Sequence, residues 1–242
     1  MNQLSFYADS KYPVRSDLDA VHEKQIDQLG DPGTWGTAEQ RLAVAGEIRQ
    51  ACYDAGVQEK PDDPGYESDI ELPEAARELI RELTLEPQGF NEESYNAARS
   101  GGLSDEEYVE MIGIIARLTC MDVFARGIGV PLRPLPEPRR GNPSCKRPAS
   151  AKKEHAWVPT VPNLPEGGDD AKEMFGDLYH PYIMRSVSLV PDEMDRHREL
   201  ENIQYLPMEK ILIKDYEHHE GFTRAQAETV AGRVSAINEC FY

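Results

Sequence analysis

The sequence has little cysteine and a deficit of positive charge. Its 242 residues include four cysteines and 8% aromatics, and 26 lysines and arginines stand against 44 aspartates and glutamates. Four cysteines far apart in the chain exclude the dense disulfide framework of a small secreted protein. The formal net charge of −18 repels phosphate backbones and anionic membrane surfaces, so we expect no nucleic-acid or membrane partner.

Long hydrophobic runs are also missing. No stretch of about 18 apolar residues occurs, which predicts that no segment spans a membrane. Residues 1–30 are polar and carry no apolar h-region of the kind that a signal peptide needs. We therefore expect a cytoplasmic protein whose length suffices for one good hydrophobic core or two small ones.

Helix signals recur along the chain, whereas the alternating pattern of a strand hardly appears. Three Ser/Thr-x-x-Glu/Gln patterns have the form of a capping box, in which two side chains satisfy free N–H groups at a helix start. They are Thr37–Gln40, Ser104–Glu107 and Thr223–Gln226. Apolar residues at helical spacing follow each of them. The sequence thus predicts an all-α fold.

The predicted helices cover residues 37–55, 73–83, 91–99, 104–126, 191–203 and 223–242. The helix over residues 104–126 is the most apolar, so we expect it to be the central buried helix. Gly113 in its middle costs stability relative to alanine, which indicates close packing against a neighbouring element.

Residues 131–167 separate two helical parts of the chain. They contain nine prolines and many basic residues, and such a proline density excludes regular helix and strand. We interpret them as a strap that lies across the acidic body of the protein. The predicted organisation is a first helical unit (1–130), this linker or strap (131–167) and a C-terminal helical segment (168–242).

The cysteines and histidines give weak signals for a site. Cys52 and Cys120 fall inside helical patterns and are interpreted as buried apolar residues, and Cys145 as an exposed thiol in a polar loop. The adjacent His218 and His219 cannot share one helix face, so we interpret them as solvated loop and expect no metal site. The sequence predicts no bound cofactor.

A short internal echo links two of the predicted helices. Thr37, Gln40 and Val44-Ala45-Gly46 recur 186 residues later as Thr223, Gln226 and Val230-Ala231-Gly232. Capping boxes are common, so chance similarity is the alternative to a true repeat.

The strongest signal for a reactive site lies in the last segment of the chain. Val234-Ser-Ala-Ile-Asn238 followed by Cys240, with Glu228 upstream, resembles the redox helix of the alkylhydroperoxidase D-like, or carboxymuconolactone decarboxylase, superfamily. The segment Gly102-Leu-Ser-Asp-Glu-Glu-Tyr-Val-Glu-Met-Ile-Gly-Ile resembles a second characteristic helix. The resemblance covers about residues 35–130 and 180–242. It implies a helical bundle of that type, with Glu228 as a proton-relay glutamate and Cys240 as the first cysteine of a Cys-x-x-Cys pair.

The family pattern continues with a second cysteine and a histidine, which here would be residues 243 and 247, beyond Tyr242. In the family the second thiol attacks the hydroperoxide and the first resolves it as a disulfide. Cys240 would then be the resolving thiol, and the 242-residue chain is expected to be inactive. One expectation is that residue 243 is selenocysteine, encoded by a UGA codon, because a selenol is ionised where a thiol of pKa about 8.5 is protonated. A deliberately chosen chain end and a disordered tail beyond Tyr242 are the alternatives.

The leading functional hypothesis is therefore a thiol- or selenol-dependent peroxidase or oxidoreductase that uses a hydroperoxide and an external thiol reductant. A decarboxylase-like enzyme on the same fold and a non-enzymatic helical assembly protein are the alternatives, and Cys240 would then be a buried, inert residue at a helix end.

Glu228 lies 12 residues before Cys240, or about 18 Å along a straight helix, so it cannot contact the sulfur directly. The family resemblance and the wide apolar helix faces also predict a homo-oligomer.

Overall fold

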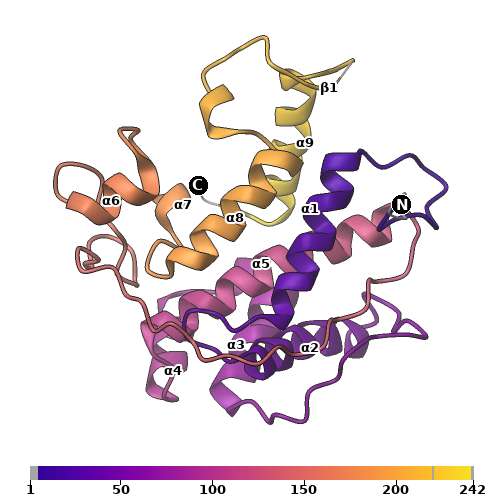
Figure 1. Ribbon diagram of the computed structural model, residues 1–242, viewed down its shortest axis with the longest axis horizontal. Coiled ribbons are helices and arrows are strands. Elements are labelled where there is room, and N and C mark those ends of the chain that lie inside the picture. The colour runs from indigo at the N-terminus through magenta and orange to yellow at the C-terminus, as the bar shows by residue number, and fades with distance from the viewer. Residues whose placement is uncertain (1–4, 220, 241–242) are drawn as a thin grey trace.

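The computed structural model describes residues 5–219 and 221–240, and this part of the chain is mainly helical (Figure 1). The α-helices are α1 (Ser16–Asp27), α2 (Ala38–Asp54), α3 (Glu74–Leu85), α4 (Glu92–Ser100), α5 (Asp105–Gly127), α6 (Gly168–Phe175), α7 (Tyr182–Arg185), α8 (Pro191–Gln204) and α9 (Arg224–Ile237). Single 3-10 turns occupy Gln28–Gly30, Pro87–Gly89 and Met208–Lys210. The expectation of a helical fold is confirmed.

One antiparallel hairpin departs from that expectation. Strands β1 (Glu217–His219) and β2 (Phe222–Thr223) pair directly before α9. His218 and His219, interpreted from the sequence as loop, therefore belong to a strand. The turn between the strands contains Gly221 with φ +76°, a left-handed conformation that glycine adopts without steric cost.

All three predicted capping boxes form. The Thr37 hydroxyl accepts a hydrogen bond from the Gln40 N–H at 3.2 Å, and the Gln40 side chain accepts one from the Thr37 N–H at 2.9 Å. The same reciprocal pairs start α5 and α9. Each box satisfies two backbone donors that the first helical turn leaves free, so these three helices begin at the predicted residues.

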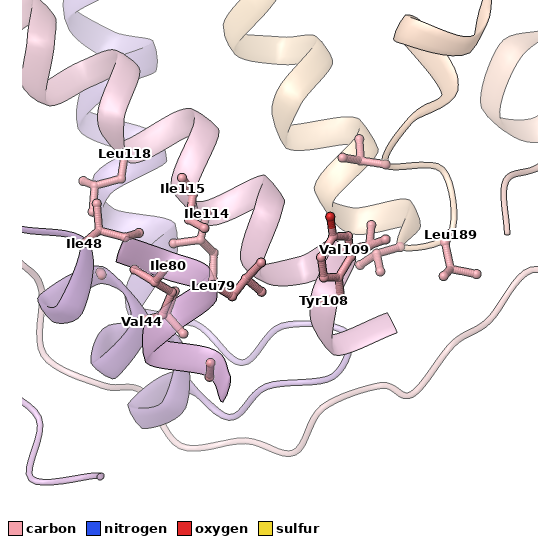
Figure 2. Close-up of a cluster of buried hydrophobic side chains, with 14 of the residues drawn as sticks. Val44, Ile48, Leu79, Ile80, Tyr108, Val109, Ile114, Ile115, Leu118 and Leu189 are labelled. Atoms are coloured by element: carbon pink, nitrogen blue, oxygen red, sulfur yellow. The ribbon is translucent and has the colours of Figure 1, made fainter. Parts of the chain in front are cut away.

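Helix α5 is the centre of the hydrophobic core, as the sequence predicted. It contacts α2, α3 and α8, while α1 lies along α8. Figure 2 shows how Ile114 and Leu118 of α5 meet Ile48 of α2 and Ile80 of α3. Leu118 and Ile80 are fully buried. Residues of α6 and α8 belong to the same cluster, so segments from both ends of the chain share one core.

Helix α1 was not predicted from the sequence. This helix is polar, and among its buried residues His22 and Gln25 are as inaccessible as Ile26. A helix that buries polar side chains lacks the apolar periodicity by which helices are recognised. Its place is set by hydrogen bonds to α8, such as the one that the Gln25 amide donates to the Arg196 carbonyl at 3.0 Å.

Residues 131–167 contain no regular helix or strand, as their prolines predicted, and in Figure 1 the first part of this segment crosses the helices at the bottom of the view. Ion pairs join it to the body at Arg133–Asp9, Arg139–Asp31, Arg147–Glu106 and Lys146–Glu173. Exposed pairs of this kind contribute about 0–1 kcal/mol each. Backbone hydrogen bonds from Arg139 to Gly30 and from Cys145 to Thr34 also hold the strap in place.

Within the described residues, none of the helices has both the length and the apolar character needed to cross a bilayer.

Candidate functional site

Cys240 lies just beyond the end of α9. The helix ends at Ile237, Glu239 adopts φ +50°, and the Cys240 N–H donates to the Ser235 carbonyl at 2.9 Å. A left-handed residue followed by a bond back to the third-last helical carbonyl is a Schellman-type helix end. The expectation that the helix continues to residue 242 is therefore wrong for residues 238–240, and residues 241–242 lie outside the described part.

The Cys240 thiol is exposed, as is that of Cys145, whereas Cys52 is buried and Cys120 is partly buried. A packed, inaccessible Cys240 is thereby excluded. Burial raises the pKa of the Cys52 and Cys120 thiols, so both stay protonated and unreactive at neutral pH. Solvent accessibility thus separates Cys240 and Cys145 from the other two cysteines.

Glu228 does not meet Cys240. Its carboxylate accepts a hydrogen bond from the Tyr205 hydroxyl at 2.9 Å and one from Arg224 Nε at 3.2 Å. It lies in the second turn of α9, and Cys240 follows the last turn. The two residues named by the family resemblance therefore stand at opposite ends of one helix.

A chain of hydrogen-bonded polar side chains ends at Cys120. The Tyr7 hydroxyl lies 2.8 Å from His22 Nδ1, and His22 Nε2 lies 2.9 Å from Gln204 Oε1. The Gln204 amide donates to the Cys120 sulfur at 3.0 Å. A neutral imidazole satisfies both of its contacts when Nε2 carries the proton and Nδ1 accepts from Tyr7. This chain connects α1, α5 and α8, and it fixes the tautomer of His22.

A second polar centre, which was not predicted from the sequence, lies between α2, α5 and α8. Arg41 Nη1 donates to Glu110 at 2.6 Å and to Glu193 at 2.9 Å. Arg117 Nη2 donates to the other oxygen of Glu193 at 2.5 Å. Arg196, at the edge, donates to Glu193 at 2.7 Å. We call these five residues the buried charge cluster; the side chains of Arg41 and Arg117 are each 1% exposed.

Electrostatics in this cluster is dominated by its arginines. Burial on its own would raise the pKa of Glu193, but the guanidiniums of Arg117, Arg41 and Arg196 outweigh burial and hold that pKa well below its usual range. Glu193 is therefore ionised at all physiological pH values. Such a group is costly to desolvate and stabilises the fold only while its partners remain in place.

The neighbouring loop closes over Glu110. The backbone N–H groups of Trp35 and Gly36 both donate to Glu110 Oε2, at 2.6 and 3.0 Å. A Cβ atom at Gly33 would come within 1.6 Å of Glu110 Oε1, so only glycine lets the loop approach this closely. Glu110 is thus held by the loop on one side and by Arg41 on the other.

The sequence did contain a signal for this cluster. Glu110 and Arg117 are seven residues apart in the most apolar helix, on the stripe that also contains Gly113. Charged residues rarely occupy a buried stripe unless they are paired. Their partners, Arg41 and Glu193, lie 69 or more residues away in sequence, and no local pattern joins them.

Among the residues that the structure describes, no group of three or more His, Cys, Asp or Glu side chains is placed to hold a metal ion. No protein-family model matches the chain, and neither a curated protein nor a solved structure matches it.

Proposed function

We propose that this protein is a thiol- or selenol-dependent peroxidase or oxidoreductase of the alkylhydroperoxidase D-like type, with Cys240 as its resolving thiol. The proposal rests on the match of Val234-Ser-Ala-Ile-Asn238 and Cys240 to the redox segment of that superfamily. The exposure of Cys240 supports it, because thiol–disulfide exchange needs access to the sulfur. The assignment of the helical fold to that family's bundle belongs to the same proposal.

The proposed reaction has two covalent steps. A partner thiolate or selenolate attacks one oxygen of the hydroperoxide, which releases an alcohol and leaves a sulfenic or selenenic acid. The Cys240 thiolate then attacks that sulfur or selenium, water leaves, and a disulfide or selenenylsulfide forms. An external dithiol reduces this bond and is itself oxidised to a disulfide. The resemblance places the partner three residues after Cys240, beyond Tyr242.

The contacts of Glu228 limit its part in this scheme. Because its carboxylate is held by Tyr205 and Arg224 at the far end of α9, a proton relay from Glu228 to the thiol would run through other groups or water. We therefore propose Cys240 as the reacting residue and Glu228 as a positioning residue.

The test is hydroperoxide consumption with a dithiol reductant, measured on protein expressed from the gene together with the sequence that follows the codon of Tyr242. Cys240→Ser is the diagnostic variant, and Cys145→Ser is its matched control because Cys145 is the other exposed thiol. We expect Cys240→Ser to abolish turnover and to remove the internal disulfide or selenenylsulfide from the mass spectrum. Turnover that persists in Cys240→Ser at the rate of Cys145→Ser would show that the proposal is wrong.

We also propose that the protein is a homo-oligomer that associates through α9. Val230, Val234 and Ile237 are each more than half exposed and lie on one stripe of this helix. The positions that precede them by 186 residues, Val44, Ile48 and Ala51, are all buried in α2. A second copy of the chain is the partner that we propose for the stripe, as members of the resembled family form dimers or larger rings.

A further inference from the structure

A cavity of about 440 Å³ lies where α5, the strap and α7 meet. Its walls include Tyr108 of α5, Trp157 of the strap and Tyr182 of α7. The volume falls within the range of about 300–1,000 Å³ that is typical of small-molecule pockets. Three segments that are far apart in sequence thus enclose a hollow that is separate from Cys240 and from the buried charge cluster.

The lining of this cavity carries no lysine, arginine, aspartate or glutamate among the residues that the structure describes. Twelve residues line it, so at the 29% charged content of the chain three or four of them would be charged. The cavity beside residues 56–63, by contrast, has Glu59, Asp62 and Arg126 in its wall. A charged ligand would lose water here and meet no opposite charge, so the lining favours an uncharged one.

Aromatic rings are concentrated in the walls and are already held in place. Tyrosine and tryptophan supply three of the twelve lining residues, although aromatic residues make up only 8% of the chain. Trp157 stacks on Tyr95 with ring centroids 6.0 Å apart, and Phe90 lies 6.1 Å from Trp157. Tyr95 also meets Tyr108 edge-on at 5.2 Å. Rings that their neighbours fix need little ordering when a ligand binds.

Tyr182 is fixed by polar contacts to residues that do not line the cavity. Its hydroxyl donates to Glu154 at 2.9 Å, and the Arg185 guanidinium lies 4.3 Å from its ring centroid. Glu154 pairs in turn with Lys152 and Arg185 at 3.4 and 3.6 Å. These charges satisfy one another, so they hold the ring of Tyr182 without presenting an unpaired charge to a ligand.

The lining changes from buried and apolar to exposed and polar. Its buried residues are mainly valines, namely Val109, Val158 and Val187. Thr160, the polar residue of the buried part, already accepts a bond from Arg185 at 3.5 Å. His155 and Ser186 are exposed and form the mouth. The Ser186 hydroxyl donates to the Ile183 carbonyl at 2.9 Å, so its own lone pairs remain open to a donor from a ligand.

We propose that this cavity binds an uncharged aromatic molecule of about two fused rings that carries a hydroxyl group. The rings pack against Trp157, Tyr182 and the valines, and the hydroxyl donates to Ser186 at the mouth. An engineered cavity of about 150 Å³ holds benzene, so a volume of about 440 Å³ admits a second ring and a substituent. This inference is independent of the chemistry proposed for Cys240.

Trp157 is a built-in reporter, because it lines this cavity whereas Trp35, the other tryptophan, lines a different one. We titrate the ¹⁵N-labelled 242-residue protein with 2-naphthol at pH 7.5 and follow the two indole signals, assigned with Trp35→Phe. The Trp157 signal should shift and saturate with a midpoint of about 0.1 mM, and the Trp35 signal should stay still.

Two analogues of similar size test the two parts of the proposal. Decahydro-2-naphthol keeps the hydroxyl but has no aromatic ring, so it should bind about threefold or more weakly than 2-naphthol. 2-Naphthoate keeps both rings but carries a negative charge that no lining residue pairs with. It should bind at least about tenfold more weakly than 2-naphthol.

Matched variants test the walls. Tyr182→Leu removes one ring and should weaken 2-naphthol binding about threefold or more, whereas Tyr182→Phe keeps the ring and should stay within about twofold. Ile183→Asp places a carboxylate in the exposed part of the lining and should weaken binding by about tenfold. Val57→Asp is its control, because Val57 is 48% and Ile183 51% exposed and Val57 lies outside this cavity. Circular dichroism checks that each variant is folded.

The comparison of the three ligands needs no variant, so it decides the question even if a variant fails to fold. The proposal is overturned if 2-naphthol leaves the Trp157 signal unchanged up to about 1 mM, or if either analogue binds as tightly as 2-naphthol. It is also overturned if a second copy of the chain occupies the cavity. In that case the Trp157 signal changes when the protein is diluted, and Ile183→Asp lowers the mass in light scattering.

Discussion

Gly113 in the middle of α5 faces the carboxylate of Glu193 on α8 with no room for a side chain between them. A Cβ atom at position 113 would lie 2.5 Å from Glu193 Oε2 and 3.1 Å from Glu193 Cβ. The close packing that the sequence predicted for Gly113 is thus confirmed, and the neighbour is a buried ion pair. Glycine is kept here at a cost of about 1 kcal/mol in helix stability relative to alanine.

We expect Gly113→Ala to destabilise the protein although alanine is the better helix former. The methyl group must displace Glu193 from Arg117, and overpacking of this kind costs about 1–3 kcal/mol. The matched control is Gly46→Ala in α2, where a Cβ atom meets nothing within 4 Å. That change should stabilise the protein by up to about 1 kcal/mol. Urea denaturation of both variants measures the difference, and equal effects would contradict the packing argument.

Glu193→Gln should destabilise the fold by about 3–5 kcal/mol, because Arg41 and Arg117 then lose a buried anionic partner. The pH dependence follows from the same residue. The pKa of Glu193 is lowered in the folded state, so its contribution is complete above the ordinary glutamate pKa of about 4.3 and is lost as pH falls toward the folded pKa. Thermal unfolding measured from pH 7 to pH 3 should show a smaller acid loss in Glu193→Gln than in the unmodified protein.

His22 should make stability fall at milder acidity. Burial lowers its pKa, although the hydrogen bond to Gln204 acts in the opposite direction. In the unfolded chain His22 binds a proton near pH 6.5, whereas the folded chain binds it only at lower pH. The contribution of His22 to the free energy of unfolding is therefore complete above about pH 6.5 and decreases below it. His22→Gln removes the contribution of this residue and should reduce the slope of the stability curve between about pH 6.5 and 5, while His197, whose pKa burial also lowers, keeps its own contribution. If the slope of stability against pH is the same in His22→Gln as in the unmodified protein, the proton is taken up by another residue.

If the exposed stripe of α9 joins two copies of the chain, a charge placed on it should change the oligomeric state and leave the fold unchanged. Val234→Glu places a charge in the middle of the proposed contact and should shift the protein toward monomer in light scattering at micromolar concentration. The far-ultraviolet circular dichroism should not change, since Val234 is 52% exposed. Thr229→Glu, an exposed position on the same helix, is the control. A monomeric mass for the unmodified protein would remove the basis for this prediction.

Local chemistry explains what could be predicted from the sequence. Capping boxes act between residues three apart, so the starts of α2, α5 and α9 could be identified, and the prolines of residues 131–167 could be interpreted without any knowledge of their partners. Gly113 was informative because glycine lowers the stability of a helix interior, so its presence in an apolar helix indicates that a neighbouring element packs closely there. These features depend on a few neighbouring residues.

The buried charge cluster could not be predicted in the same way. Whether Arg41 pairs with Glu193 depends on the packing of α2, α5 and α8, which brings together residues 152 positions apart. Helix α1 was not predicted for a related reason. Its buried His22 is held by hydrogen bonds to Tyr7 and Gln204, and no apolar periodicity marks the helix in the sequence. For Cys240, the end of α9 at Ile237 depends on the left-handed Glu239, a residue type that seldom adopts this conformation.

Helix α9 makes its main contacts with β1 and β2, the hairpin that directly precedes it in sequence. A segment held by its sequence neighbours can open without disturbing the rest, so its backbone amides should exchange their hydrogens through a local unfolding event. The amides of α5, packed between α2, α3 and α8, are expected to exchange only when the whole core opens. We therefore expect two cooperative units of unequal stability, and Cys240 directly follows the less stable one.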